Sequence, residues 1–236
     1  MTSPSPARRR PDGVLEVQRW PRTEYGEAHR RQEELLEQRI RGDIADQLLL
    51  TEHDPVITLG RGADPAQFAQ LSLPVVQVER GGDATYHGPG QLVAYPILAL
   101  PEDRRDLHRH LRELEEVVIG VLDEVDVAGV RKPGLTGVWI GEKKVCSIGV
   151  AVRRWVTWHG FALNLATDLA AFAQFKPCGL DPSVMTNVAE HVELPPTRLL
   201  FEVLVVKHMC RVFELELPTP PPPSSDGPLA LPIWPG

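Results

Sequence analysis

The sequence predicts a domain of the mixed α/β class, because helical and strand patterns both recur along its 236 residues. Long segments carry apolar residues at three- and four-residue steps, which is typical of amphipathic helices. Shorter apolar or alternating segments, separated by glycine, proline and aspartate, are typical of strands and turns. Hydrophobic residues make up 42% of the chain, so a domain of this length can bury a sizeable core.

The helical pattern is clearest in the middle of the chain, where seven leucines and valines recur between Leu107 and Val125. Thr23 and Asp103 are suitable N-caps for the first two helices, and Gly42 is a suitable stop. His108 and His110 are two residues apart, so they point to different sides of a helix, and we expect both to be exposed. Helices are expected over 23–41, 103–125 and 197–213, with one or two helical turns over 64–70 and a short helix over 168–175.

Strand patterns fill most of the remaining chain. The segment 144–152 follows a turn at 141–143 and forms a predicted hairpin with the strand before it. On this return strand, Lys144 shares a face with Cys146 and Ile148, which is unusual because lysine is normally a solvated surface charge. Strands are expected over 14–19, 48–51, 56–59, 75–78, 92–98, 137–140, 144–152 and 155–165.

The two ends of the chain lack these patterns. We expect a domain over 14–216, an N-terminal tail over 1–13 and a proline-rich tail over 217–236. Three cysteines, far apart in sequence, argue for reduced thiols in a cytoplasmic protein. The formal net charge of −7 argues against general nucleic-acid binding, and no apolar run is long enough to span a membrane.

A glycine-rich loop, 80–91, with the sequence RGGDATYHGPGQ, connects two predicted strands. Glycine has no Cβ, so such a loop can approach a ligand closely. The phosphate-loop pattern is excluded because no lysine follows Gly88 or Gly90, and the dinucleotide pattern because Val93 stands where a third glycine is needed. The composition is equally compatible with an ordinary connection between strands.

Cys178 is the first candidate for chemistry, because it lies in a Pro-Cys-Gly turn, whereas Cys146 and Cys210 fit a strand and a helix. A tight turn exposes a nucleophile and offers backbone amides to an oxyanion, although turns also hold inert cysteines. The cysteines and histidines lack the short spacings of zinc sites, so no metal site is expected. A serine hydrolase is disfavoured because the G-x-S-x-G motif is missing.

Five separated segments together resemble the motifs of the lipoyl(octanoyl) transferases, also called octanoyl-[acyl carrier protein]:protein N-octanoyltransferases. The resemblance extends from about residue 14 to residue 213, and the two tails have no counterpart. One departure is Cys146, which stands where a small residue such as alanine is usual. The segments are 80–97 (RGGDATYHGPGQLVAYPI), 136–140 (TGVWI), 143–149 (KKVCSIG), 159–164 (HGFALN) and 177–179 (PCG).

The resemblance implies the fold of the biotin/lipoate protein ligase superfamily, a mixed central β-sheet flanked by helices. It also implies that octanoate leaves octanoyl-acyl carrier protein, is held as a thioester on Cys178, and passes to a lysine of a lipoyl domain. Lys144 matches the residue that lowers the pKa of this thiol. The acyl pocket is matched by Arg80, Gly81, Gly82, Asp83, Ala84, Thr85, Tyr86, His87, Ser147, Ile148, Gly149, Gly160, Phe161 and Ala162.

The implied partners are octanoyl-acyl carrier protein, the lipoyl domains of 2-oxoacid dehydrogenase complexes and the glycine cleavage H protein. No cofactor, ATP or metal is expected, since exchange between thioesters is nearly isoenergetic. We expect Lys143, Arg153 and Arg154, at turns flanking the Lys144 strand, to dock an acidic partner. Two alternatives remain: an ATP-dependent lipoate– or biotin–protein ligase of the same superfamily, and a non-enzymatic scaffold that binds acyl or lipoyl proteins.

Overall fold

The computed structural model describes residues 13–175 and 177–219, which fold around a seven-stranded sheet and a smaller three-stranded sheet. In the large sheet only β1 and β2 are parallel, and all other neighbours are antiparallel. The predicted mixed α/β class is therefore confirmed. The large sheet consists, in spatial order, of β1 (Leu15–Thr23), β2 (Asp46–His53), β6 (Gln91–Ile97), β10 (Val156–Asn164), β9 (Lys143–Arg153), β8 (Leu135–Ile140) and β7 (Gly129–Lys132).

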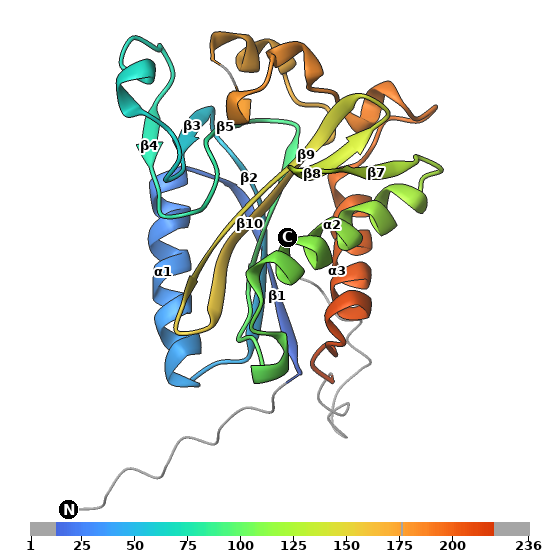
Figure 1. Ribbon diagram of the computed structural model, residues 1–236. Helices are drawn as coiled ribbons and strands as arrows, with labels where there is room; N and C mark the ends of the chain where they lie inside the picture. The colour runs from blue at the N-terminus through green and yellow to red at the C-terminus, as the bar shows by residue number, and fades with distance from the viewer. Residues whose placement is uncertain (1–12, 176, 220–236) are drawn as a thin grey trace, which may run out of the picture.

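Helices cover both faces of this sheet (Figure 1). Helix α1 (Tyr25–Arg41) packs Ala28 and Leu36 onto one face, against a cluster that includes Trp158. Helices α2 (Leu107–Asp123) and α3 (Arg198–Phe213) pack together on the other face, where they bury the leucine and valine stripe of α2. The three-layer arrangement follows from the apolar periodicities, because each amphipathic helix must bury its stripe against a sheet face.

Two of the predicted helix caps are wrong by a few residues. The carboxylate of Glu24, rather than Thr23, accepts hydrogen bonds from the first amides of α1, and Asp106, rather than Asp103, does so in α2. The predicted stop of α1 is confirmed, since Gly42 has φ of +79°, a left-handed conformation that favours glycine. His110 is also not exposed as predicted: it is 1% exposed and packs against Phe213.

The small sheet contains a strand that periodicity did not predict. Its strands are β4 (Val75–Gln77), β3 (Val56–Leu59) and β5 (Ala84–His87), with β3 in the centre. Strand β5 lies inside the expected glycine-rich loop and pairs antiparallel with β3. A strand of four residues is too short to show a period of two, so the sequence pattern did not reveal β5 within the loop. Strand β7 also has four residues and was missed for the same reason. The 3-10 turns are η1 (Pro65–Phe68), η2 (Glu102–Arg104), η3 (Leu169–Gln174), η4 (Pro177–Gly179), η5 (Pro182–Val184) and η6 (Val188–Glu190).

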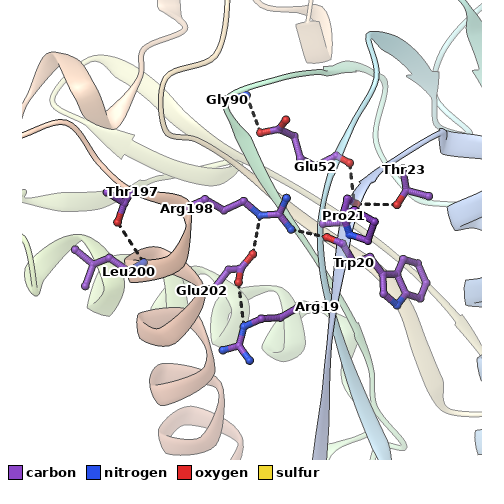
Figure 2. A network of polar contacts seen from close by, with 11 residues as sticks. Arg19, Trp20, Pro21, Thr23, Glu52, Gly90, Thr197, Arg198, Leu200 and Glu202 are labelled. Atoms are coloured by element: carbon purple, nitrogen blue, oxygen red, sulfur yellow. Dashed lines mark hydrogen bonds and ion pairs between the residues drawn. The ribbon is translucent and has the colours of Figure 1, made fainter. Parts of the chain in front are cut away.

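A buried carboxylate fastens the start of α3 to β1 (Figure 2). Glu202, 4% exposed, accepts hydrogen bonds from Arg19 at 3.0 Å and from Arg198 at 2.6 Å. Arg198 also donates to the carbonyl of Trp20 at 2.7 Å. The figure also shows Glu52 of β2 accepting from the amide of Gly90, at 3.0 Å, which fixes the end of the glycine-rich loop.

The two ends of the described chain meet beside β1. The amide of Leu15 donates to the carbonyl of Glu216 at 2.8 Å, and the amide of Glu216 donates to the carbonyl of Gly13 at 2.8 Å. This pairing extends the structured part of the chain to residue 216. The predicted tails, 1–13 and 217–236, lie almost entirely outside the described residues and stay predictions.

Candidate functional site

A cavity lies where the small sheet meets the middle of the large sheet. Ten of the fourteen residues expected in the acyl pocket line it, from the loop after β4 and from β5, β9 and β10. The sequence interpretation missed four further lining residues, Tyr25, Val93, Tyr95 and His159. The complete lining is Tyr25, Arg80, Gly82, Thr85, His87, Val93, Tyr95, Ser147, Ile148, Gly149, His159, Gly160, Phe161 and Ala162.

Arg80 holds the glycine-rich loop in place. Its buried guanidinium donates to the carbonyls of Asp83 and Thr58, both at 2.8 Å, and to the Thr58 hydroxyl at 2.9 Å. A Cβ on Gly60 would stand 2.5 Å from the carbonyl oxygen of Gly82, so the β3 end and the loop can approach only because Gly60 has no side chain. Arg80 therefore shapes the cavity wall by ordering the backbone around it.

Four predicted pocket residues do not line this cavity. Ala84 and Tyr86 point into a separate apolar cluster with Phe172 under the small sheet. Asp83 uses Oδ1 to accept the amide of Ala84, at 2.7 Å, and the amide of Gly81 donates to the carbonyl of Val150, at 2.9 Å. Strand alternation explains the split, since Thr85 and His87 of β5 face the cavity while Ala84 and Tyr86 face away.

The glycines of β9 and β10 serve packing between protein atoms. A Cβ on Gly160 would lie 2.2 Å from the carbonyl oxygen of Ala94 and 2.5 Å from Cδ of Pro96. A Cβ on Gly149 would lie 3.0 Å from Cδ of Arg80. The missing side chain of Gly160 is therefore required by the neighbouring strand, and the predicted place of Gly160 in an acyl pocket stays a prediction.

A chain of hydrogen bonds runs from the cavity wall toward Lys144. Nδ1 of His87 donates to Oε1 of Gln91 at 2.8 Å, and Nε2 of Gln91 donates to Oδ1 of Asn164 at 2.9 Å. Nδ2 of Asn164 donates to the carbonyl of Thr186 at 3.1 Å, and the amide of Thr186 donates to the carbonyl of Lys144 at 3.0 Å. These contacts join β5, β6, β10 and β9 at one end of the molecule.

Lys144 is buried, with only 3% of its surface exposed, as its predicted position beside apolar residues suggests. Its side chain passes over Gly137, whose Cβ would lie 2.7 Å from Cε of Lys144, and its Nζ lies 5.9 Å from the centre of the Trp139 ring. The shared face with Cys146 is not confirmed. Val138 and Trp139 pair with Cys146 and Lys144, so Val145 is an extra residue that interrupts the alternation.

The backbone of Cys178 lies in η4, where the amide of Leu180 donates to the carbonyl of Pro177 at 3.0 Å and Gly179 has φ of +72°. This confirms the predicted tight turn. The side chain of Cys178 lies outside the described part of the structure. Turn η4 packs on β5, and a Cβ on Gly179 would lie 3.8 Å from the carboxylate of Asp83. Figure 1 shows this segment, in orange, at the same end of the molecule as β5.

The imidazoles around the cavity are neutral. Burial lowers the pKa of His87 to about 3 and that of His159 to about 3. Burial also lowers the pKa of His53 to about 4. His53 donates from Nδ1 to the carbonyl of Thr23 at 2.8 Å, so its Nε2 accepts the hydroxyl of Tyr95 at 2.7 Å. Burial likewise raises the pKa of the Cys146 thiol, although Lys144 opposes this shift.

Two of the three residues expected to dock an acidic partner do not lie near Lys144. Arg153 and Arg154 lie at the far end of β9 from Lys144, a separation of about 30 Å for nine residues of strand. Arg154 borders a different hollow with Gly13 and Leu215, and Arg153 forms an ion pair with Glu37 at 2.7 Å. Lys143 stays near the candidate site, where its ammonium donates to the carbonyl of Ser183.

Comparison with known proteins identifies a family. Residues 24–210 match the family described as the lipoyl protein ligase A/B catalytic domain. An octanoyltransferase of Geotalea uraniireducens is 47% identical over 169 residues, which cover 72% of this chain and 79% of the relative. An octanoyltransferase of Syntrophotalea carbinolica is 43% identical over 194 residues, covering 82% of this chain and 92% of the relative.

Solved structures share the fold at lower sequence identity. The putative lipoate protein ligase Ta0514 of T. acidophilum, with bound lipoic acid, has a TM-score of 0.66 at 16% identity, covering 88% of each chain. Lipoate-protein ligase A bound with ATP has a TM-score of 0.64 at 16% identity, covering 88% of this chain and 90% of the other. Among the described residues, no helix is both long and apolar enough to cross a membrane.

Proposed function

Since the chain belongs to the family of lipoyl protein ligase A/B catalytic domains and is an acyltransferase of protein lipoylation, we propose that it carries octanoate on Cys178. Its relatives are octanoyltransferases at 43–54% identity, and this identity extends over most of the chain. Its substrates are, in general terms, an acyl carrier protein and a lipoyl domain. We propose the lipoyl domains of 2-oxoacid dehydrogenase complexes and the glycine cleavage H protein as the acceptors.

In the first step the Cys178 thiolate attacks the octanoyl thioester of acyl carrier protein. The new carbon–sulfur bond forms at Cys178, the bond to the carrier sulfur breaks, and the ammonium of Lys144 gives a proton to the departing thiolate. Lys144 is then neutral and takes a proton from the acceptor lysine as that amine attacks the enzyme thioester. The amide forms, Cys178 leaves as a thiolate, and the starting charge state is restored.

One observation supports Lys144 in this role above others. A buried lysine in a strand is unusual, and here the cation is held over Gly137 within the fold rather than extended to solvent. Its backbone is joined through Thr186, Asn164 and Gln91 to His87 in the cavity wall. An ammonium in such surroundings stabilises a thiolate and lowers its pKa.

The cavity suits the acyl chain. Its lining includes Val93, Tyr95 and Ala162, which belong to one apolar cluster on the α1 face of the sheet, and its imidazoles are neutral. An octanoyl chain is accommodated by apolar walls, and the guanidinium of Arg80 in the lining is already solvated by the carbonyls of Asp83 and Thr58. We therefore assign the predicted pocket residues that line this cavity to the octanoyl group.

The proposed reaction uses no ATP, cofactor or metal, because the activated acyl group arrives as a thioester. A lipoate ligase of the same fold would instead require ATP. Turnover of octanoyl-acyl carrier protein in EDTA without nucleotide is expected, and activity that appears only when ATP and Mg²⁺ are added would favour the ligase. A scaffold without activity would form no acyl-enzyme.

The direct test is intact-mass analysis after mixing with octanoyl-acyl carrier protein. The Cys146→Ala/Cys210→Ala double variant should gain one octanoyl group, and adding Cys178→Ala should abolish this gain. Lys144→Met, in the same double variant, should raise the pH midpoint of Cys178 alkylation by iodoacetamide, since a shift of one pH unit corresponds to about 1.4 kcal/mol of lost thiolate stabilisation. Coincident alkylation profiles would contradict the role of Lys144.

A further inference from the structure

Three potential metal ligands from distant parts of the sequence converge beside the cavity. His29 lies on α1, Glu79 follows β4, and His159 lies on β10. Their candidate donor atoms all lie within 4.8 Å of one another. Nε2 of His29 is 3.1 Å from Oε2 of Glu79, and Nε2 of His159 is 3.9 Å from the same oxygen.

The backbone of β10 is distorted at His159. This residue has φ of +56°, a left-handed conformation that is uncommon for a residue with a side chain. Regular alternation would send Trp158 and His159 to opposite faces, yet their rings stack with centres 4.1 Å apart. The distortion therefore brings the imidazole to the side of the sheet covered by α1, where it meets His29 with ring centres 5.8 Å apart.

His159 is otherwise an unexplained buried polar group. Only 2% of it is exposed, and neither ring nitrogen has a hydrogen-bond partner among the described residues. Leaving a buried polar atom unsatisfied costs about 1–3 kcal/mol, and the left-handed backbone adds its own strain. A fold that accepts both costs at one residue is expected to use that imidazole for a contact with something else.

A second carboxylate lies near His29 on the same helix. Nδ1 of His29 is 3.8 Å from Oε2 of Glu33, one helical turn along α1, which is longer than a hydrogen bond but close enough for Glu33 to accept from this nitrogen once Nε2 binds an ion. Glu79 is 53% exposed at its side chain, so an ion can reach the group from solvent. The nearby cations are Arg80, which is buried in the loop, and Arg153, which lies over the Trp158 ring.

We propose that His29, Glu79 and His159 form a binding site for a divalent first-row transition-metal ion, with zinc as the best match. Two imidazoles and one carboxylate are ligands that Zn²⁺ takes at about 2.0–2.2 Å, leaving a fourth tetrahedral position for water. In a tetrahedral site with such bonds the ligand atoms lie about 3.4 Å apart. The donor atoms of the three residues would therefore reach one ion after side-chain movements of about 1 Å. The ion takes the place of the hydrogen bond between His29 and Glu79 and gives His159 its missing partner.

This site was not predictable from sequence spacing. Zinc sites are recognised when ligands lie within a few residues of one another, whereas these three come together only through the packing of α1 on the sheet. The ion takes no part in the proposed transfer chemistry. Instead it would join α1, the residue that precedes the glycine-rich loop and β10, next to the cavity.

Calorimetric titration of ZnCl₂ into metal-free protein without a polyhistidine tag tests the site. One ion per chain is expected, with at least tenfold weaker binding in His29→Gln and in Glu79→Gln. Both side chains are partly exposed, so these variants should fold, which circular dichroism checks. His108→Gln changes an exposed histidine far from the cluster and serves as the matched control. Zn²⁺ should raise the Tm of wild type and of this control, since it binds only the folded state.

Cys178→Ala separates the proposed site from thiol binding. This variant should bind Zn²⁺ as wild type does, and loss of binding there would assign the ion to the cysteine and overturn the proposal. Equal affinity in wild type and His29→Gln would also overturn it, as would the lack of any binding up to millimolar Zn²⁺. A cobalt-substituted protein provides a second readout, because a tetrahedral Co²⁺ site with two imidazoles gives visible absorption that His159→Asn should remove.

Discussion

Replacing Gly160 by alanine should severely destabilise the domain. The added Cβ would stand 2.2 Å from the carbonyl oxygen of Ala94 and 2.5 Å from Cδ of Pro96, where ordinary van der Waals contact begins at 3.4 Å. Relief therefore needs a displacement of about 1 Å between β6 and β10. Neither neighbour is the flexible end of a side chain, so the two central strands of the large sheet must separate locally.

The expected cost has two parts. Overpacking of a close-packed interior typically costs about 1–3 kcal/mol. Weakening two or so ladder hydrogen bonds between β6 and β10 adds about 1 kcal/mol for each. We therefore expect the free energy of unfolding to fall by about 3–5 kcal/mol, a large part of the 5–15 kcal/mol that stabilises a typical domain.

Urea unfolding followed by circular dichroism measures this loss, and Gly81→Ala is the matched control. Gly81 lies between the cavity-lining residues Arg80 and Gly82, but its added Cβ would meet nothing closer than the Val150 carbonyl oxygen at 3.7 Å. That variant should stay within about 1 kcal/mol of wild type. A stable Gly160→Ala protein with weakened binding of octanoyl-acyl carrier protein would refute this reasoning, because the space at Gly160 would then serve the acyl group and not the packing of β6 on β10.

Three further changes test other parts of the fold. His110→Leu should reduce the loss of stability in acid, because burial lowers the pKa of His110 to about 4 and the unfolded chain therefore binds a proton below about pH 6.5 that the folded chain does not bind. In urea unfolding, the free energy of unfolding of wild type should fall by about 2 kcal/mol more than that of the variant between pH 7 and pH 5. Glu202→Gln should lower the free energy of unfolding by about 1–3 kcal/mol, because it removes the buried negative charge that pairs with two partly exposed arginines. An unchanged midpoint of urea unfolding would contradict this. Asn164→Ala should slow acyl-enzyme formation at least tenfold, because it breaks the series of hydrogen bonds that leads to Lys144. The control Asn187→Ala removes a buried amide bonded to Thr167 and should lower stability alone. Equal acylation rates in the two variants would show that these hydrogen bonds do not position the lysine.

The sequence predicted best those features that depend on one helix or strand alone. The leucine and valine period of α2 and the glycine stop of α1 are local features, and both agree with the structure. The first cap was misplaced because Thr23 and Glu24 can both accept amide hydrogen bonds, and only the end of β1 decides between them. His110 could not be placed, since its burial depends on where α3 lies.

The site was predictable to the extent that one continuous segment contributes it. Residues 147–149 and 160–162 line the cavity as the family motifs suggest. Within 80–87 the motif cannot tell which side chains point inward, because that depends on the register of β5 against β3. Tyr25 and Tyr95 reach the cavity from α1 and β6, and no spacing along the chain indicates that they meet there.

The pairing of Glu216 with Gly13 and Leu15 makes the folded chain nearly a closed ring. A short peptide could connect residues 13 and 216 without crossing the molecule, because they already share hydrogen bonds. New ends could then be opened at Gly134, in the turn between β7 and β8, where an added Cβ meets no atom within 4 Å. Such a circular permutant keeps every strand pair of the sheet and moves the chain ends to a different part of the surface.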